Sequence, residues 1–295
     1  MWEYDSLIGK AQVYFARARE HPHSDDEEFA LWLLLGLEFL LRAPLAQIHP
    51  SLLAAPEGNS ILHSVGVTTI ENPKSIPAHT VIDRLGHVIP GFGGDRQSDA
   101  RDLVALRNNE LHTGSAILAA VTNEAWLPRF TRVAEALCAH LGLSVEDLVG
   151  EEVAELGSAL VDAEDKRLAA EVAKRIQDCS EFFQKLQATE VTARRRPVGL
   201  VRPLVEVTTC PACAEHGDLA LMTVRSTDER LEDDDFVSDR ICVATGFGCA
   251  VCGLVLTGTA EVKAAGLPQQ VTRTERESAI DRFMSDYVDD DYGND

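Results

Sequence analysis

The chain has 295 residues, of which 45% are hydrophobic, so it is long enough to bury a globular core without disulfide cross-links. Its 48 acidic side chains outnumber 27 lysines and arginines, and the net charge of −21 excludes a protein that binds polyanions through a generally positive surface. The longest apolar run, Phe29–Leu41, contains Gly36 and Glu38 and is too short to cross a bilayer, so we expect no membrane span. The first residues have no basic segment followed by an apolar stretch, and we expect a cytoplasmic protein.

The first 190 residues have the apolar spacing of amphipathic helices. Glu3–Arg19 predicts one helix, and Ser24–Glu27 has the form of a capping box that begins a strongly apolar helix, which Pro44 is expected to end. Further helices are expected, in chain order, over Thr80–Ile89, from Ser98 or Asp99 onward, and over Asn123–Leu141, Val145–Val161 and Glu164–Leu186. Because the links between them are short, we expect an up-and-down bundle over residues 1–190.

The composition changes after residue 190. Residues 191–203 contain four arginines, two prolines and no acid, which predicts a basic linker. The side chains that could hold an RNA backbone there are Arg194, Arg195, Arg196 and Arg202. A solvated linker, or one that pairs with acidic residues further along the chain, is the alternative. Residues 204–266 are rich in Val and Thr and predict a small β domain, while residues 267–295 predict a polar, acidic tail with one short helix near Ile280–Tyr287.

Two C-x-x-C units lie in the predicted β domain, 35 residues apart: Cys210 with Cys213, and Cys249 with Cys252. Each tight turn brings two thiolates to one ion, and two such turns complete a tetrahedral set of four sulfurs that suits zinc. The pattern resembles a zinc ribbon. We expect a structural ion, because a catalytic zinc keeps an open position and so small a β domain has a thin core. Redox-active dithiols are the alternative.

The remaining candidates around the cysteine pairs are weaker. Cys242 and His216 lie close in sequence and could replace a ligand, with a less suitable spacing. Cys138 and Cys179 fall on apolar helix faces and are expected in the core. The acidic segment 228–240, between the two pairs, is expected to be a solvated loop.

An arginine followed by a histidine after four to six residues occurs at three places: Arg17 and His23, Arg42 and His49, and Arg107 and His112. A proline interrupts the first two pairs. The third pair lies late in a predicted helix, and Asn108 directly follows its arginine. Arginine binds phosphate oxygens, and histidine can transfer a proton near neutral pH, so the third pair is a candidate for RNA cleavage.

The segment "RNNELH" resembles the R-x4–6-H motif of the HEPN (higher eukaryotes and prokaryotes nucleotide-binding) family, in which an asparagine often follows the arginine. The resemblance covers roughly residues 5–190 and includes the apolar helix that carries Glu38. It implies a homodimer in which two motifs meet in one cleft. It also implies that His112 transfers the proton, Arg107 stabilises charge on the phosphate, Asn108 orients the substrate or His112, and Glu38 orients the arginine.

Helical geometry places a condition on this site. Five residues along a straight helix rotate a side chain by about 500°, or about 140° net, so Arg107 and His112 do not share one face. Either the helix bends at Asn108–Asn109 or a second subunit completes the site. The alternative without catalysis is that Arg107 pairs with Asp102 or Glu110 while His112 caps the helix end.

The sequence therefore predicts a mainly α fold: a HEPN-like antiparallel helical bundle followed by a small β zinc-ribbon domain. The predicted function is a metal-independent endoribonuclease, of the kind that HEPN proteins supply to toxin–antitoxin and antiviral defence systems. RNA, with tRNA as one candidate, would be the substrate, and an antitoxin or another defence protein a partner. The alternative is a non-catalytic dimer that acts as an adaptor or binding module through its zinc ribbon.

Overall fold

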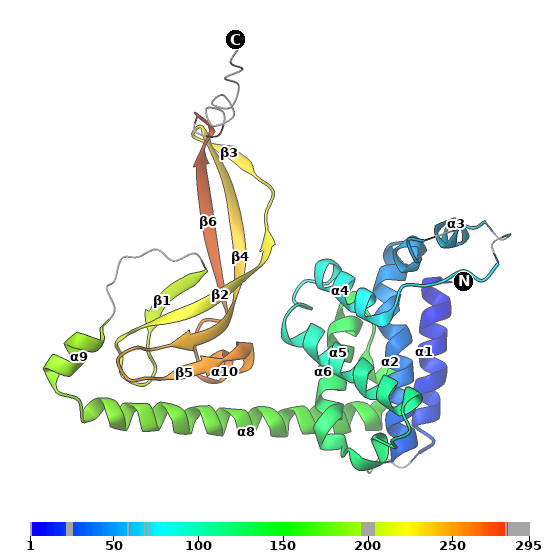
Figure 1. The fold of residues 1–295 in the computed structure, drawn as a ribbon, viewed down its shortest axis with the longest axis horizontal. Helices are drawn as coiled ribbons and strands as arrows, with labels where there is room; N and C mark the ends of the chain where they lie inside the picture. Colours follow the sequence, from blue (N-terminus) through cyan, green and yellow to red (C-terminus); the bar gives the residue numbers. More distant parts are fainter. Residues whose placement is uncertain are drawn as a thin grey trace, which may run out of the picture. The chain divides into compact units, whose positions relative to one another are not determined.

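The computed structural model describes residues 2–21, 26–57, 59–67, 69, 71–195, 204–280 and 282 (Figure 1). The chain divides into two compact units, Met1–Asp165 and Lys166–Asp295. The division falls inside one long helix, whereas the sequence placed the end of the helical part at residue 190.

The first unit is helical. Its elements in chain order are α1 (Tyr4–Ala18), α2 (Glu27–Ile48), η1 (Pro50–Leu53), α3 (Ser60–Ser64), α4 (Ala78–Val88), α5 (Asp95–His112), η2 (Leu118–Ala120), α6 (Asn123–Leu141), α7 (Val145–Val149) and the beginning of α8 (Glu151–Gln184). Helix α2 is the central element, because it packs against α1, α4, α5 and α6. The fully buried rings of Phe15, Phe29, Phe92 and Phe130 belong to this core, and Phe15 meets Phe130 edge to face with ring centroids 6.2 Å apart.

Helix α2 is longer than the sequence predicted. The Asp26 side chain caps it by accepting a hydrogen bond from the Glu28 N–H at 2.8 Å. The prediction that Pro44 ends the helix is wrong, because the helix continues to Ile48 with Pro44 buried. A proline inside a helix removes one backbone hydrogen bond, and burial of the neighbouring Leu41 and Leu45 offsets that loss.

The sequence predicted no membrane span because the apolar run is short, but helix α2 is longer than that run. By length and composition its 22 residues, with a mean hydropathy of 1.7 over their most apolar stretch, are enough to cross a bilayer. In the structure 67% of that stretch is buried against the rest of the protein. A helix in the core of a globular protein can have the same length and apolar composition as a membrane span, and it is mostly buried, as α2 is.

Helix α8 replaces two predicted helices with one. The segments Val145–Val161 and Glu164–Leu186 were expected to be separate, but α7 is short and α8 runs without a break over 34 residues. From residue 158 to residue 184 the sequence has no glycine or proline and is rich in Ala, Glu, Lys and Leu, which favour helix.

The second unit combines the later part of α8 with a sheet and two short helices. Its further elements are α9 (Ala188–Arg194), β1 (Val205–Thr209), β2 (His216–Ser226), β3 (Arg230–Glu232), β4 (Asp235–Gly248), β5 (Val255–Thr257), α10 (Gly258–Ala264) and β6 (Gln270–Ser278). The strand order is β1-β2-β4-β3, with β5 and β6 also paired to β4, and all pairings are antiparallel. In Figure 1, β4 and β6 run side by side over much of their length.

The predicted fold class, a mainly α helical bundle followed by a small β zinc ribbon, is therefore wrong. The described residues form a mixed fold with ten α-helices and a six-stranded antiparallel sheet. Strand β4 alone has 14 residues and pairs with four other strands. The acidic segment expected as a loop forms β3 and the beginning of β4, and the expected tail begins as β6.

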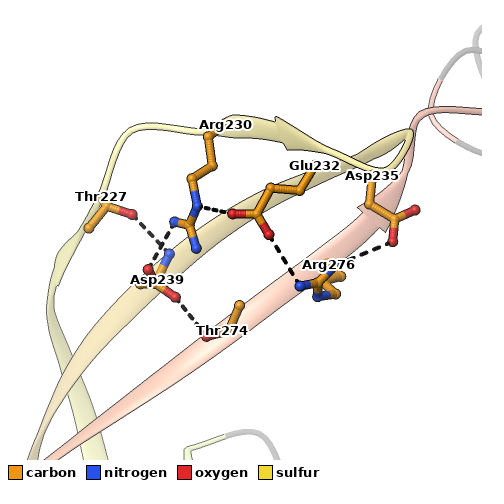
Figure 2. A network of polar contacts seen from close by, with 7 residues as sticks. All are labelled: Thr227, Arg230, Glu232, Asp235, Asp239, Thr274 and Arg276. Atoms are coloured by element: carbon orange, nitrogen blue, oxygen red, sulfur yellow. Dashed lines mark hydrogen bonds and ion pairs between the residues drawn. The ribbon is translucent and has the colours of Figure 1, made fainter.

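Charged side chains, rather than apolar ones, join the strands at this end of the sheet (Figure 2). Arg230 bonds Glu232 at 2.6 Å and Asp239 at 2.9 Å, and the Thr274 hydroxyl donates to Asp239 at 2.7 Å. The hydrogen bond from Thr274, followed by the one from Arg230, holds the pKa of the Asp239 carboxyl below its usual value. The sequence shows no apolar alternation here, because ion pairs between the strands stabilise this part of the sheet, whereas buried apolar side chains stabilise most strands.

The turn that joins β3 to β4 explains how the acidic segment forms a hairpin. Asp233 and Asp234 have φ of 49° and 68°, and two successive residues with positive φ make the tight turn that matches the twist of a two-stranded ribbon. Aspartate tolerates this conformation better than most residues. The predicted helix near Ile280–Tyr287 lies almost wholly outside the described residues.

Candidate functional site

The four cysteines of the two C-x-x-C units meet in the second unit. Their sulfur atoms all lie within 4.8 Å of one another, and all four residues are buried. The Sγ atoms of Cys210 and Cys252 are 3.6 Å apart, as are those of Cys213 and Cys249. The arrangement could hold one metal ion, as the sequence predicted.

The two cysteine turns share one backbone design. In each turn the N–H of the first cysteine donates to the carbonyl five residues later, and the N–H four residues later donates back to the carbonyl of that cysteine. The bonds are Cys210 N–H to Glu215 O at 2.8 Å, Ala214 N–H to Cys210 O at 3.0 Å, Cys249 N–H to Leu254 O at 2.9 Å, and Gly253 N–H to Cys249 O at 2.9 Å.

The residue after each second cysteine has positive φ, 61° at Ala214 and 82° at Gly253. This conformation closes both turns, and alanine adopts it only with strain. A glycine at position 253 is compatible with positive φ, whereas the alanine at position 214 gives no sign of it in the sequence.

The four thiols of the cluster shift one another's pKa values. Burial raises the pKa of Cys213 to about 12, and the hydrogen bond from Cys210 lowers the pKa of Cys249 to about 5. The hydrogen bond to Cys249 and burial both raise the pKa of Cys210, and burial raises that of Cys252. Four buried thiolates this close together repel one another, and a bound metal ion would supply the positive charge that offsets this repulsion.

The weaker candidates lie outside the cluster. Cys242 is buried and contacts the Thr223 hydroxyl at 3.6 Å, while His216 is an exposed residue of β2. Cys138 is buried in the helical unit, where burial raises its pKa to about 12. Cys179 of α8 packs against the apolar core that surrounds the four cysteines.

Two of the four arginines predicted to bind RNA contact the cysteine turns. Arg194 donates to the carbonyl of Val251, between the second pair of cysteines, at 3.4 Å. Arg195 forms two bonds to the Glu215 carboxylate, at 2.9 and 2.7 Å, just after the first pair. Arg196 and Arg202 lie outside the described residues.

The second candidate site lies in the helical unit, around Arg107. The Arg107 guanidinium of α5 forms an ion pair with Glu38 of α2, and Arg42 bonds the other carboxylate oxygen of Glu38 at 3.0 Å. The three side chains are 13%, 20% and 11% exposed in that order. Burial lowers the pKa of Arg42, and the Glu38 carboxylate opposes that effect. Two largely buried arginines therefore share one carboxylate.

The non-catalytic alternative named the wrong partners for Arg107. Asp102 pairs with Arg129 at 3.2 Å, and the Glu110 carboxylate accepts the Leu118 N–H at 2.9 Å. The partner is Glu38, a residue of the apolar helix that the sequence associated with the arginine.

His112 and Asn108 are not brought onto the face of Arg107. Helix α5 is continuous from Asp95 to His112, so it has no break at Asn108–Asn109, which was one of the two alternatives for this site. His112 is the last helical residue, is exposed, and has no hydrogen bond or ion pair to any described residue. Asn108 is half-exposed. One chain therefore does not bring these three side chains together at one site.

The two other arginine and histidine pairs differ from this one. His23 lies outside the described residues. Arg42 belongs to the Glu38 cluster, and His49 caps η1 by accepting the Ser51 N–H at 3.1 Å.

Comparison of the chain with known protein families, with curated proteins and with solved structures gives no match.

Proposed function

We propose that the protein is a metal-independent endoribonuclease that acts as a homodimer, with Arg107 and His112 as its catalytic residues. The observation that supports this best is the ion pair between Glu38 and Arg107, which joins α2 to α5. The HEPN resemblance gives Glu38 the role of orienting the arginine, and an arginine held by a carboxylate keeps its fixed fork in one direction.

In the proposed reaction His112 accepts the proton of a ribose 2′-hydroxyl, and the 2′-oxygen attacks the adjacent phosphorus. The bond to the 5′-oxygen breaks, and that oxygen takes a proton from His112 of the partner subunit. The products are a 2′,3′-cyclic phosphate and a free 5′-hydroxyl. Arg107 stabilises the negative charge that develops on the phosphate oxygens, and Asn108 orients the substrate.

The continuous α5 supports the proposal of a dimer. Because Arg107 and His112 point about 140° apart, one chain cannot direct both at the same phosphate. Leu111, next to His112, is 46% exposed, and a second protomer would cover it.

The ion proposed for the four-cysteine cluster is Zn²⁺ in a structural role. Four buried sulfurs from two equivalent turns match the coordination number and ligand type of a structural zinc site and leave no position for substrate. The proposed chemistry at Arg107 and His112 does not use this ion.

The test is cleavage of total RNA or tRNA by purified protein that retains its metal, in buffer without Mg²⁺. We expect products with 2′,3′-cyclic phosphate ends, and a loss of about 100-fold or more in rate for Arg107→Ala and for His112→Ala. The matched controls are Arg101→Ala, on the same helix, and His87→Ala, both exposed residues, which should cleave at the normal rate. Cleavage by His112→Ala at the normal rate would overturn the proposal.

A non-catalytic adaptor is the second candidate, and the Glu38 contact also favours it. An arginine already paired with a carboxylate is less available to a phosphate. RNA left intact by a protein that is shown to be dimeric, for example by analytical ultracentrifugation, would support the adaptor. In that case an antitoxin or other defence protein would be sought as the partner.

A further inference from the structure

Cationic and aromatic side chains alternate on one face of the helical unit. Lys10, Tyr14 and Arg17 are four and three residues apart on α1, so they share one side of that helix. Trp32 and Phe39 are seven residues apart on α2 and also share a side. We call these five residues the aromatic platform. Both cations are exposed, and the three rings are half-buried.

The Tyr14 ring lies at the centre of the aromatic platform. It stacks against Trp32 with centroids 5.6 Å apart and an angle of 30° between the rings, and its centroid is also 5.6 Å from that of Phe39. Lys10 Nζ lies 5.0 Å from the Tyr14 centroid, and the Arg17 guanidinium lies 4.8 Å from the Trp32 centroid. A positive charge therefore sits at each end of a continuous aromatic surface.

The charge on the aromatic platform differs from that of the whole chain. Acids outnumber bases by 48 to 27, yet neither Lys10 nor Arg17 forms an ion pair with a carboxylate of the described residues. Val13, between them on the same side of α1, is 48% exposed. Because cations already lie against the rings, a cationic ligand is repelled. A ligand with negative charge and flat rings is attracted.

We propose that the aromatic platform binds single-stranded RNA, with bases stacked on its rings and phosphates held by Lys10 and Arg17. Proteins that hold single strands combine aromatic stacking surfaces with positive side chains in this way. The choice of RNA rests on the proposed ribonuclease function. Phe39 directly follows Glu38, the partner of Arg107, so one helix, α2, carries both part of the aromatic platform and the carboxylate that holds the catalytic arginine.

The first test measures binding without cleavage. Protein with His112→Ala is titrated into a fluorescein-labelled oligouridylate, and anisotropy gives the Kd at several salt concentrations. In this background Lys10→Glu with Arg17→Glu should weaken binding by about tenfold or more and reduce the slope of log K against log salt by about 1.4, for two phosphate contacts. The matched control, Arg167→Glu with Lys174→Glu, makes the same charge change at two exposed positions of α8. Equal weakening by both pairs would overturn the proposal.

The second test reports stacking without altering the rings. The chain has three tryptophans, of which Trp126 is 2% exposed, so Trp2→Phe leaves Trp32 as the one half-exposed indole. Oligouridylate should quench its fluorescence, and a duplex RNA of equal length should quench it much less because its bases are paired. Equal quenching by both RNAs, or none by the single strand, would overturn the proposal.

The two tests separate this proposal from the proposed function. Cleavage that persists in His112→Ala contradicts the catalytic assignment but leaves the binding measurement valid. Normal binding by Lys10→Glu with Arg17→Glu contradicts the aromatic platform but leaves the assignment of Arg107 and His112 unaffected.

Discussion

The two units of the chain are stabilised by different means. The helical unit buries large apolar side chains from every major helix around α2. In the second unit the buried set is smaller and includes the four cysteines of the cluster, and the far end of its sheet exposes 64% of Leu231. One unit therefore depends on the hydrophobic effect, and the other on a proposed ion near one end of its sheet and on ion pairs at the other.

This difference determines where each unit is sensitive. In a close-packed core, a change of one methyl group is costly, whereas exposed ion pairs tolerate substitution. A metal site concentrates a large binding energy in a few bonds, so its loss affects everything built around it. The following predictions separate these three behaviours, beginning with the largest effect.

Removing the proposed metal ion should unfold the sheet of the second unit and leave the helical unit folded. Binding of a structural zinc is worth about 10–16 kcal/mol, which is comparable to or larger than the whole stability of a domain, about 5–15 kcal/mol. A strong chelator, or Cys252→Ser, should therefore abolish amide-exchange protection in β2 and β4 but not in α2 and α6. The control is Cys242→Ser, a buried cysteine outside the cluster. Full protection of β4 in metal-free protein would show that the sheet does not depend on the ion.

Replacing Glu38 with glutamine should destabilise the helical unit by about 3 kcal/mol, the usual cost of removing one partner from a largely buried ion pair. Two positive side chains, Arg42 and Arg107, would then remain close together with little solvent. Urea denaturation measures the change. Asp102→Asn breaks the more exposed pair with Arg129 and should cost less than about 1 kcal/mol. Equal losses in the two variants would mean that burial of the Glu38 cluster is energetically unimportant.

Gly36→Ala should destabilise the same unit by about 1–3 kcal/mol, although alanine is the better helix former. Gly36 faces Phe15, and an added Cβ would collide with the edge of that ring. Gly9→Ala provides the matched control, because a Cβ at Gly9 meets no atom within 4 Å and should stabilise α1 by up to about 1 kcal/mol. Thermal unfolding of both variants tests whether the space around each glycine decides if alanine raises or lowers the stability.

The smallest effect should be found at the charged end of the sheet. Because the pKa of Asp239 is lowered in the folded state, its contribution to stability is complete above the unfolded pKa, near 3.9, and is lost as pH falls through the folded value. Thr274→Val removes the hydroxyl that bonds Asp239 and should raise this pKa, as measured by carboxyl chemical shifts. Thr272→Val, an exposed threonine on the same strand, should leave the titration unchanged. If the pKa of Asp239 were the same in both variants, Thr274 would not be what lowers it.

The sequence predicted best where one interaction dominates. The range Asn123–Leu141 was predicted from its apolar stripe and is confirmed as α6, since Trp126, Phe130 and Leu137 face the core. The meeting of the four cysteines is also confirmed, because two tight turns with paired thiols have few other uses.

The sequence predicted poorly where tertiary contacts decide the structure. Pro44 normally ends a helix, but its buried neighbours keep α2 intact. The acidic segment and β6 have no apolar alternation, so their pairing through the Thr274 bond to Asp239 and the Arg276 pair with Glu232 could not be read from a pattern. Nor does composition reveal that Arg195 bonds Glu215.

Those arginine contacts would extend the influence of the proposed ion beyond the sheet. Arg194 and Arg195 end α9, and each bonds a different cysteine turn, so the end of that helix is tied to both halves of the cluster. If the ion leaves and the turns separate, the two arginines lose their partners together. The peptide bonds that follow them are the kind that trypsin cleaves, and the rate of digestion at this point would then report how much of the protein carries its metal.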